Sequence, residues 1–227
     1  MQLPSHPSLP KRLRRPLAIG AISIVAITLL VVVFYFIAQP YVASQLGSVE
    51  DRRSGRLVYK VPSRLTNDRS LIPRLFGGTE SSDMVARAAT WSWRETGATD
   101  TIDNLLFSMG YSYVEARGAI PSDRTSVITQ LKQSSQASIV SRIQTITGCR
   151  DSPGVTLSDF SPAGTKGFSY DYSCTDRRGA KLHGTASFLL VDDSNELHLL
   201  IMLGREDIWQ NNRSRITTMM NEIKVAK

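Results

Sequence analysis

The stretch FSYDYSCTDRRGAKLHGTASFLLVDDSNELHLLIML, residues 168–203, decides the fold. In its first seven residues, aromatic and cysteine side chains alternate with Ser, Asp and Ser, which predicts a strand with one wet face. Two polar turns then separate two apolar runs, 181–191 and 197–203. With Val191 opposite Leu197, both faces of this hairpin are largely apolar. We therefore expect a central antiparallel pair of strands that is covered on both sides.

Working outward from this meander, the chain shows both strand and helix patterns. Residues 57–61 alternate weakly and are followed by Pro62, which predicts an edge strand. Tyr111 and Tyr113 also alternate and predict a short strand. Apolar residues at helical spacing predict helices over residues 84–91, 102–109, 123–147 and 208–223. The predicted fold class is α+β, with an antiparallel sheet covered by helices.

A long apolar segment precedes this domain. Leu17 to Ala38 carries no charge, and a helix of this length rises about 33 Å, enough to cross a hydrocarbon core of about 30 Å. A cleaved signal peptide is the alternative, but its apolar region is normally ~7–15 residues long. Basic residues on the near side favour an N-terminus in the cytoplasm. These topogenic residues are Lys11, Arg12, Arg14 and Arg15.

The segment predicts a single-pass membrane protein with a signal anchor, located in the cell membrane. Its C-terminal domain is expected to be periplasmic or extracellular. The expected parts are a cytoplasmic basic tail (1–15), a transmembrane helix (16–39), a juxtamembrane linker (40–56) and an extracytoplasmic α+β domain (57–227). Arg52, Arg53 and Arg56 then lie close to the bilayer, where they can contact anionic lipid headgroups, or simply belong to a solvated stalk.

The charge distribution argues against a nucleic-acid partner. The formal net charge of +7 includes four basic residues that precede the first acidic one, Glu50. From Thr79 to Lys227 the chain has 16 basic and 17 acidic residues. A domain that binds DNA or RNA normally has a basic face that neutralises phosphates. We therefore expect no nucleic acid among the partners.

Cys149 and Cys174 are the two cysteines of the chain. In an oxidising compartment they are expected to form a disulfide, and with two cysteines only one pairing exists. Two free buried thiols are the alternative. A metal site would need further ligands, and neither cysteine has a neighbouring histidine.

The order of the predicted elements resembles that of a known fold. A strand that ends at Pro62 is followed by a mid-chain helix, a three-strand meander and a terminal helix with an early Trp209. This order is similar to that of the PsbP/Mog1-type α/β/α sandwich over about half of the chain. The resemblance implies an accessory or assembly role, usually without enzymatic activity.

No pattern in the sequence indicates an enzyme. There is no G-x-S-x-G, P-loop or G-x-G-x-x-G motif. His183 and His198 fall on paired strands, but the predicted register places them roughly 23 Å apart, too far to share a metal. The Asp192–Glu196 turn lacks the ligand spacing of a calcium loop. We therefore expect no catalytic residues, no cofactor and no bound metal.

Trp91 and Trp93 are candidate anchors for a partner protein. On the predicted helix, residues two apart point in different directions, so one tryptophan is expected to be buried and the other exposed. Core packing is the alternative for both. The leading hypothesis is a membrane-anchored accessory or assembly subunit of a membrane or cell-envelope complex, whose partners are other membrane or envelope proteins and the lipid bilayer. The alternatives are an envelope module that binds a small ligand or lipid in an apolar pocket, and a secretion-system component with an NTF2-like fold.

Overall fold

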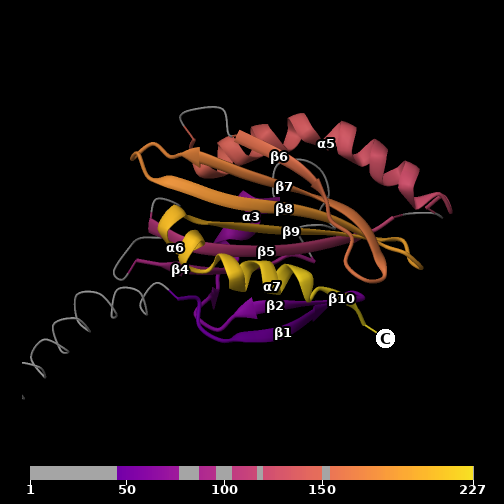
Figure 1. The fold of residues 1–227 in the computed structure, drawn as a ribbon, viewed down its shortest axis with the longest axis horizontal. Helices are drawn as coiled ribbons and strands as arrows, with labels where there is room; N and C mark the ends of the chain where they lie inside the picture. The colour runs from indigo at the N-terminus through magenta and orange to yellow at the C-terminus, as the bar shows by residue number, and fades with distance from the viewer. Residues whose placement is uncertain (1–44, 77–86, 96–103, 117–119, 150–153, 227) are drawn as a thin grey trace, which may run out of the picture. The chain divides into compact units, whose positions relative to one another are not determined.

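In the computed structural model, the described residues are 45–76, 87–95, 104–116, 120–149 and 154–226. The chain divides into two units, residues 1–45 and residues 46–227, and only Gln45 of the first unit is described. The second unit consists mainly of two antiparallel sheets (Figure 1). Its helices are η2 (Arg69–Leu71), α3 (Ile72–Phe76), α5 (Arg124–Thr147), α6 (Glu206–Asn211) and α7 (Arg213–Asn221).

The larger sheet has seven strands in the order β3-β4-β5-β9-β8-β7-β6. The smaller sheet has the order β1-β2-β10. The strands of the larger sheet are β3 (Thr66–Asn67), β4 (Ala89–Arg94), β5 (Leu105–Glu115), β6 (Gly154–Asp159), β7 (Thr165–Thr175), β8 (Lys181–Val191) and β9 (Glu196–Arg205). Those of the smaller sheet are β1 (Val49–Ser54), β2 (Leu57–Pro62) and β10 (Lys224–Val225).

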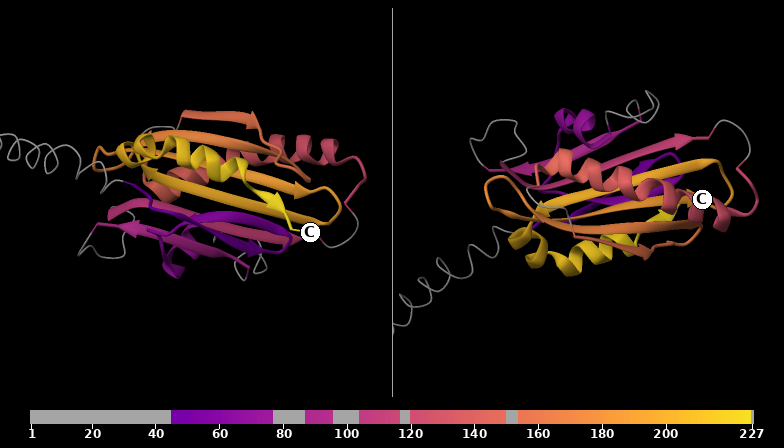
Figure 2. Two further views of the ribbon diagram at one scale, coloured as in Figure 1. Left: turned by 60° about the horizontal axis from the view of Figure 1, so that its bottom comes forward. Right: turned by 90° about the horizontal axis from the view of Figure 1, so that it is seen from above.

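Both faces of the large sheet are covered, as expected for its central strands. On the face that carries Phe168 and Tyr170, here called the α5 face, the sheet packs against α5 and α3. On the opposite face, here called the α7 face, it packs against α6, α7 and the smaller sheet. Figure 2 shows α5 and the α6–α7 pair on opposite sides of the sheet.

The two longest features of the sequence pattern fold as predicted. Asp123 caps α5 by accepting a hydrogen bond from the Ser126 backbone N–H at 3.2 Å, and Gly148 ends the helix at a φ of 62°. Strand β8 covers the first predicted apolar run, and β9 contains the second. Local spacing was sufficient here because each element has a clear beginning and end.

The fold class needs a correction, because the structure is mostly β-sheet and has fewer helices than predicted. Residues 102–109 were predicted as a helix, but from Leu105 onward they belong to β5. Residues 89–94, also partly assigned to a helix, form β4. β5 lies between two strands, and its large side chains Phe107, Met109, Tyr111 and Tyr113 alternate with Ser108, Gly110 and Ser112. The helix prediction instead followed the spacing of Leu105, Leu106 and Met109, and so it overlooked this alternation.

Two further strand predictions were wrong in detail. β2 is the central strand of the small sheet and not an edge strand, because β1 and β10 pair with its two sides. The β8–β9 register differs by one residue, since Leu190 and not Val191 lies opposite Leu197. Glu196 begins β9 and does not end the turn. As a result, His198 lies opposite Leu189 and not Leu190.

The predicted membrane topology is also corrected. None of the helices in the described ranges of the chain is long and apolar enough to cross a membrane. The expected basic tail (1–15) and span (16–39) lie outside the described residues. The signal-anchor, single-pass and periplasmic or extracellular predictions rested on apolar length. Because apolar length is a necessary condition for a membrane span and not a sufficient one, these predictions are dropped.

A close crossing on the α5 face explains why β8 has a glycine at position 184. The Tyr172 side chain of β7 lies across Gly184 and donates a hydrogen bond from its hydroxyl to the Met202 carbonyl of β9 at 3.2 Å. A Cβ at Gly184 would clash with the Tyr172 ring and lie 2.5 Å from the Met202 carbonyl oxygen. The missing side chain therefore lets one tyrosine connect three strands.

We expect Gly184→Ala to lower the free energy of unfolding by about 2 kcal/mol, because the overpacked Tyr172 ring must move and lose its hydrogen bond. Urea denaturation of the wild type and the variant measures this difference. Gly154→Ala is the control, since its Cβ would make only an ordinary contact, 3.6 Å from Ser173 Oγ. Equal stability of Gly184→Ala and the wild type would contradict the prediction.

Candidate functional site

A groove of about 520 Å³ lies on the α7 face of the large sheet. It runs between the sheet strands β6, β7 and β8 and the helices α6 and α7. We call it the polar groove. It is lined by Ser158, Phe160, Ser169, Asp171, His183, Gly184, Thr185, Trp209, Gln210, Arg213, Ile216, Thr217, Met220 and Asn221.

The floor of the polar groove is a set of hydroxyl-bearing side chains on three adjacent strands. In the observed register Ser158, Ser169 and Ser187 lie opposite one another across β6, β7 and β8. The next row on the same face consists of Thr156, Asp171 and Thr185. This floor is the wet face that the alternation in residues 168–174 predicted.

The buried hydroxyls of the floor satisfy one another. Ser169 Oγ lies 2.7 Å from Thr185 Oγ1 and 3.1 Å from Ser187 Oγ. All three residues are buried, whereas Thr156, Ser158 and Asp171 are exposed. Thus the deep part of the floor is fixed by internal hydrogen bonds, and the outer part is open to a ligand.

One end of the polar groove is built by an aromatic and acidic group around His183. The His183 Nδ1 contacts the Glu206 carboxylate, and the ring stacks with Trp209 at a centroid distance of 6.0 Å. Partial burial would raise the pKa of Glu206, but hydrogen bonds from Gln210 and His183 outweigh it and hold this pKa below its usual value. The carboxylate therefore stays ionised and fixes the imidazole against the groove wall.

Two exposed charges of opposite sign flank the floor. Asp171 extends from β7, and Arg213 from the first turn of α7. Within the described part of the chain, neither side chain has an ion-pair partner. Exposed hydroxyls, a carboxylate and a guanidinium together provide hydrogen-bond donors and acceptors for a ligand.

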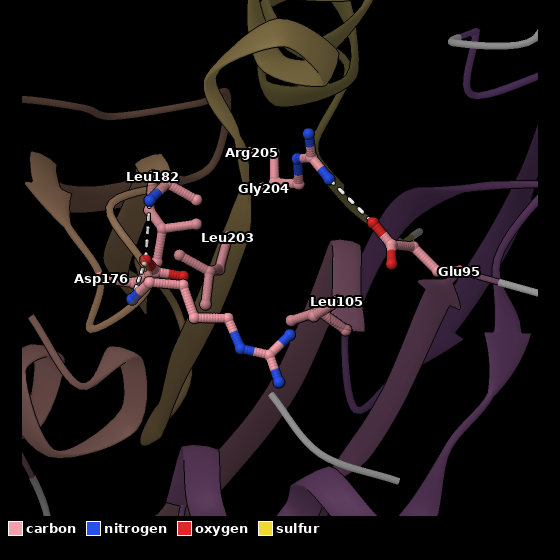
Figure 3. Close-up of a pocket in the computed structure, with 9 residues that line it drawn as sticks. Glu95, Leu105, Asp176, Leu182, Leu203, Gly204 and Arg205 are labelled. Atoms are coloured by element: carbon pink, nitrogen blue, oxygen red, sulfur yellow. Dashed lines mark hydrogen bonds and ion pairs between the residues drawn. The ribbon is translucent and has the colours of Figure 1, made fainter. Parts of the chain in front are cut away.

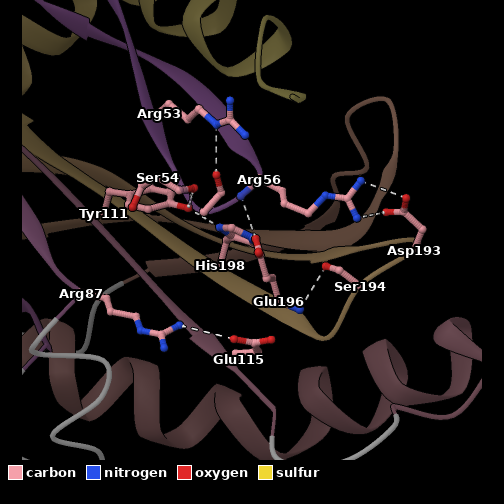
Figure 4. Close-up of polar contacts among 11 residues, drawn as sticks. Arg53, Ser54, Arg56, Arg87, Tyr111, Glu115, Asp193, Ser194, Glu196 and His198 are labelled. Atoms are coloured by element: carbon pink, nitrogen blue, oxygen red, sulfur yellow. Dashed lines mark hydrogen bonds and ion pairs between the residues drawn. The ribbon is translucent and has the colours of Figure 1, made fainter. Parts of the chain in front are cut away.

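A second polar cluster lies inside the protein, where the small sheet meets β5 and β9 (Figure 4). His198 is 1% exposed, and its Nε2 lies 3.0 Å from a Glu196 carboxylate oxygen. The same oxygen accepts a hydrogen bond from the Arg56 backbone N–H at 2.8 Å. His198 Nδ1 contacts the Tyr111 hydroxyl, and that hydroxyl donates to the Ser54 carbonyl at 3.1 Å.

Burial controls the protonation of this inner cluster. It lowers the pKa of His198 to about 4, and it raises the pKa of the Tyr111 hydroxyl well above its usual value. Tyr113 also stacks on the His198 ring at a centroid distance of 5.3 Å. The hydrogen bonds from the Arg56 backbone to Glu196 and from Tyr111 to the Ser54 carbonyl hold the small sheet against β9 and β5.

A smaller pocket of about 160 Å³ lies at the end of the sheet where β8 begins and β9 ends (Figure 3). An ion pair between Arg205 and Glu95, 2.9 Å apart, lies at one side of it. On the other side, the Asp176 carboxylate accepts hydrogen bonds from the backbone N–H groups of Arg178 and Ala180. These polar groups are already engaged with one another, and the pocket is too small for most ligands.

The predicted disulfide is present. Cys149, just after α5, is bonded to Cys174 near the end of β7. The bond therefore joins the C-terminal end of the long helix to the sheet.

The predicted headgroup-contact arginines form contacts within the protein. The Arg56 guanidinium forms two hydrogen bonds to the Asp193 carboxylate at 2.8 and 2.9 Å. Arg52 pairs with Glu50 at 2.8 Å, and the Arg53 Nε donates to the Gly55 carbonyl at 3.3 Å. Lys11, Arg12, Arg14 and Arg15 lie outside the described residues.

The predicted contrast between the two tryptophans does not arise, because they lie on a strand and share one face. Trp91 is buried and packs edge-to-face against Tyr59, with ring centroids 6.1 Å apart. Trp93 is half-buried beneath the Arg64 guanidinium, 4.1 Å from its ring centroid. Trp91 is therefore a core residue, whereas Trp93 is partly exposed and lines an open pocket, so its role as a partner anchor stays a prediction.

Sequence reasoning identified the groove floor but missed its wall. Trp209 was placed on the terminal helix without a role, and Glu206, Arg213 and Thr217 were not singled out. On a single terminal helix, the spacing of these residues indicates no shared site. The chain in fact forms two helices that meet at Asn212, and this break brings the residues to one side of the groove floor. A signal that could have found them is the charged, Trp-containing start of a helix that directly follows a buried strand.

Comparisons with known proteins give a likeness of structure only. No family model matches the sequence, and neither does any curated protein. The cyanobacterial PsbP structure of Synechocystis is 16% identical with a TM-score of 0.49, over 79% of this chain and 93% of that chain. The Ran-binding protein Mog1p of Saccharomyces cerevisiae is 10% identical with a TM-score of 0.40, over 79% and 97%.

The chain is also similar to LpqN of Mycobacterium tuberculosis, a protein involved in cell envelope biogenesis. LpqN is 8% identical with a TM-score of 0.42, over 79% of this chain and 91% of that chain. The fold is PsbP/Mog1-like. The resemblance seen in the order of elements is thereby confirmed. At these identities the likeness concerns the fold, and the functional argument rests on the polar groove.

Proposed function

We propose that this domain is a non-catalytic binding module, an accessory or assembly subunit that holds a partner protein in the polar groove. The observation that carries the proposal is the open outer part of the groove floor, in a sheet whose other central strands are covered on both faces. Its exposed hydroxyls and its two unpaired charges suit hydrogen bonds with a polar segment better than burial of an apolar one.

The chemistry of the groove supports binding and not catalysis. The groove offers donors and acceptors along its length and an aromatic surface at Trp209. His183 is the one imidazole among its lining residues, and Glu206 holds that ring in place from the Nδ1 side. Groups of this kind fix the orientation of a bound segment without activating it.

A photo-crosslinking amino acid at position 217 or 218 tests the proposed site. Both positions are exposed threonines on α7, but Thr217 lines the polar groove and Thr218 does not. In cells that express the full chain, we expect a covalent adduct with a partner protein from position 217 only. Reversal of the charge in Arg213→Glu should lower the adduct yield about tenfold, equivalent to about 1.4 kcal/mol of binding. Equal adduct yields from positions 217 and 218, or an adduct yield that Arg213→Glu leaves unchanged, would reject the proposed site.

A small polar ligand is the second candidate, and the wall of the groove favours it. The groove volume lies within the usual range for ligand sites, and the stacked His183 and Trp209 rings can pack against a ring-shaped molecule. This differs from the lipid alternative, which required an apolar pocket, because the polar groove is open and most of its lining residues are polar. A rise in melting temperature with a defined polar compound, abolished in Trp209→Ala, would favour this candidate.

A further inference from the structure

The outer edge of β6 is an open side of the large sheet. β6 is the last strand in the sheet order, and among the described residues no strand pairs with its outer side. The backbone N–H and C=O groups along such an edge can form hydrogen bonds with a further strand. At the opposite edge, β3 contains only two residues, so it offers a much shorter site.

The edge of β6 lacks the charges that usually protect an exposed strand. Its sequence is GVTLSD, and Asp159, at its end, is the single charged residue. β1, the exposed edge of the small sheet, has the sequence VEDRRS with four successive charged residues. Charges and short strands are the usual means by which proteins prevent unwanted pairing at an edge. β1 and β3 are protected in these ways, but β6 is not.

The two faces of β6 specify which side chains an added strand should carry. Val155 and Leu157 lie on the α5 face, opposite Tyr172 and Tyr170. Thr156 and Ser158 lie on the α7 face and continue the floor of the polar groove. Leu157 is 42% exposed, and in the described part of the chain no other large hydrophobic side chain is exposed to this degree. An added strand would therefore match β6 with apolar residues on one face and small polar residues on the other.

We propose that β6 accepts an extended segment of a partner protein as an eighth strand of the large sheet. This deepens the binding role proposed above and rests on it. Apolar residues of the segment alternate with Ser or Thr. Its apolar side chains pack beside Leu157, and its polar side chains extend the floor of the polar groove. Main-chain hydrogen bonds supply most of the affinity, and the alternating side chains supply the specificity.

A second copy of this chain fits the edge less well. Two six-residue strands with one exposed leucine each would form a much smaller interface than the ~1,600 Å² that a stable complex usually buries. An extended segment can bury more surface than that, because it follows β6 along its length and also reaches the polar groove beside it.

The test uses the full chain and a labelled eight-residue peptide in which Val or Leu alternates with Ser or Thr between terminal lysines. Fluorescence anisotropy should show saturable binding of this peptide and no binding of a scrambled peptide of the same composition. Two N-methylated versions block alternate N–H groups. We expect the version that blocks the N–H groups facing β6 to lose at least tenfold in affinity, and the other version to bind normally.

Variants of the exposed Leu157 locate the binding at the edge. Leu157→Lys places a protective charge on the strand and should weaken peptide binding at least tenfold, whereas Leu157→Val should change it less than about twofold. Circular dichroism checks that both variants are folded. Similar affinity of Leu157→Lys and the wild type, or equal affinity of both N-methylated peptides, overturns the proposal. So does the absence of peptide binding at millimolar concentration.

Three other outcomes separate this proposal from its alternatives. A concentration-dependent dimer that Leu157→Lys abolishes, with no peptide binding, would show that the occupant is a second copy and overturn the proposal. If the peptide fails to bind but the position-217 adduct persists, strand addition is rejected and the binding role stands. If both are lost, both proposals fall.

Discussion

The free energy of unfolding is expected to fall by about 3 kcal/mol as the pH is lowered from 6.5 to 4, because His198 is buried. Burial lowers the pKa of this histidine from 6.5 to about 4 in the folded chain. Between these values the unfolded chain binds a proton at His198 that the folded chain does not bind. Acidification therefore favours the unfolded state, and the contribution of His198 levels off below about pH 4.

Urea denaturation at a series of pH values measures this effect. In His198→Gln the side chain cannot titrate, so the difference between the wild type and the variant isolates the histidine from carboxylates that titrate near pH 4. The Glu196 carboxylate, 3.0 Å from Nε2, favours the charged ring and opposes the effect of burial. An NMR titration of His198 with a midpoint at or above 6.5 would show that the carboxylate prevails, and would refute the prediction.

The second large effect is expected from the disulfide. Cys149 and Cys174 are 25 residues apart in the sequence, and opening a loop of this length costs about 3.5 kcal/mol in the chain-entropy model. We expect the double variant Cys149→Ser, Cys174→Ser to lose about this much stability. Denaturation of the wild type with and without a reducing agent measures the same quantity independently.

The double serine variant is the control for the reducing agent, which should have no effect on it. A loss below about 1 kcal/mol in both experiments would contradict the prediction. It would mean that α5 is held to β7 and β8 by packing alone. Ile128, buried among the aromatic residues of the α5 face, is the described side chain of α5 best placed to provide that packing.

The sequence determined the parts of the fold whose pattern is local. The alternation in 168–174 correctly placed Tyr170 and Tyr172 on one face of β7, and Ser169 and Asp171 on the other. Asp123 and Gly148 correctly marked the ends of α5. In these places the chain meets solvent on one side, so the polar residues reveal the period.

Prediction failed where a helical and a strand spacing overlap in the same residues, or where the meaning of a charge depends on distant residues. Met109, the last apolar position of the predicted 102–109 helix, lies on β5, which has neighbours on both sides and both faces. The charges of 49–54 suggested a linker, yet they protect the edge strand β1. The one-residue difference in the β8–β9 register depends on Glu196, whose partners include Arg56, 140 positions away.

The two-residue strand β10 pairs with β2, so the small sheet joins the beginning and the end of the described domain. Asn212 adds a second link, because its side chain accepts a hydrogen bond from the Leu46 backbone N–H, 166 positions earlier. During synthesis, β1 and β2 emerge from the ribosome long before these partners do. The apolar residues Leu57, Tyr59 and Val61 of this hairpin therefore stay exposed until the last helix has been synthesised and packs on them. Chaperone dependence of the nascent chain would accordingly be concentrated at its first strands, and a stop codon a few residues early would leave β2 with an open edge.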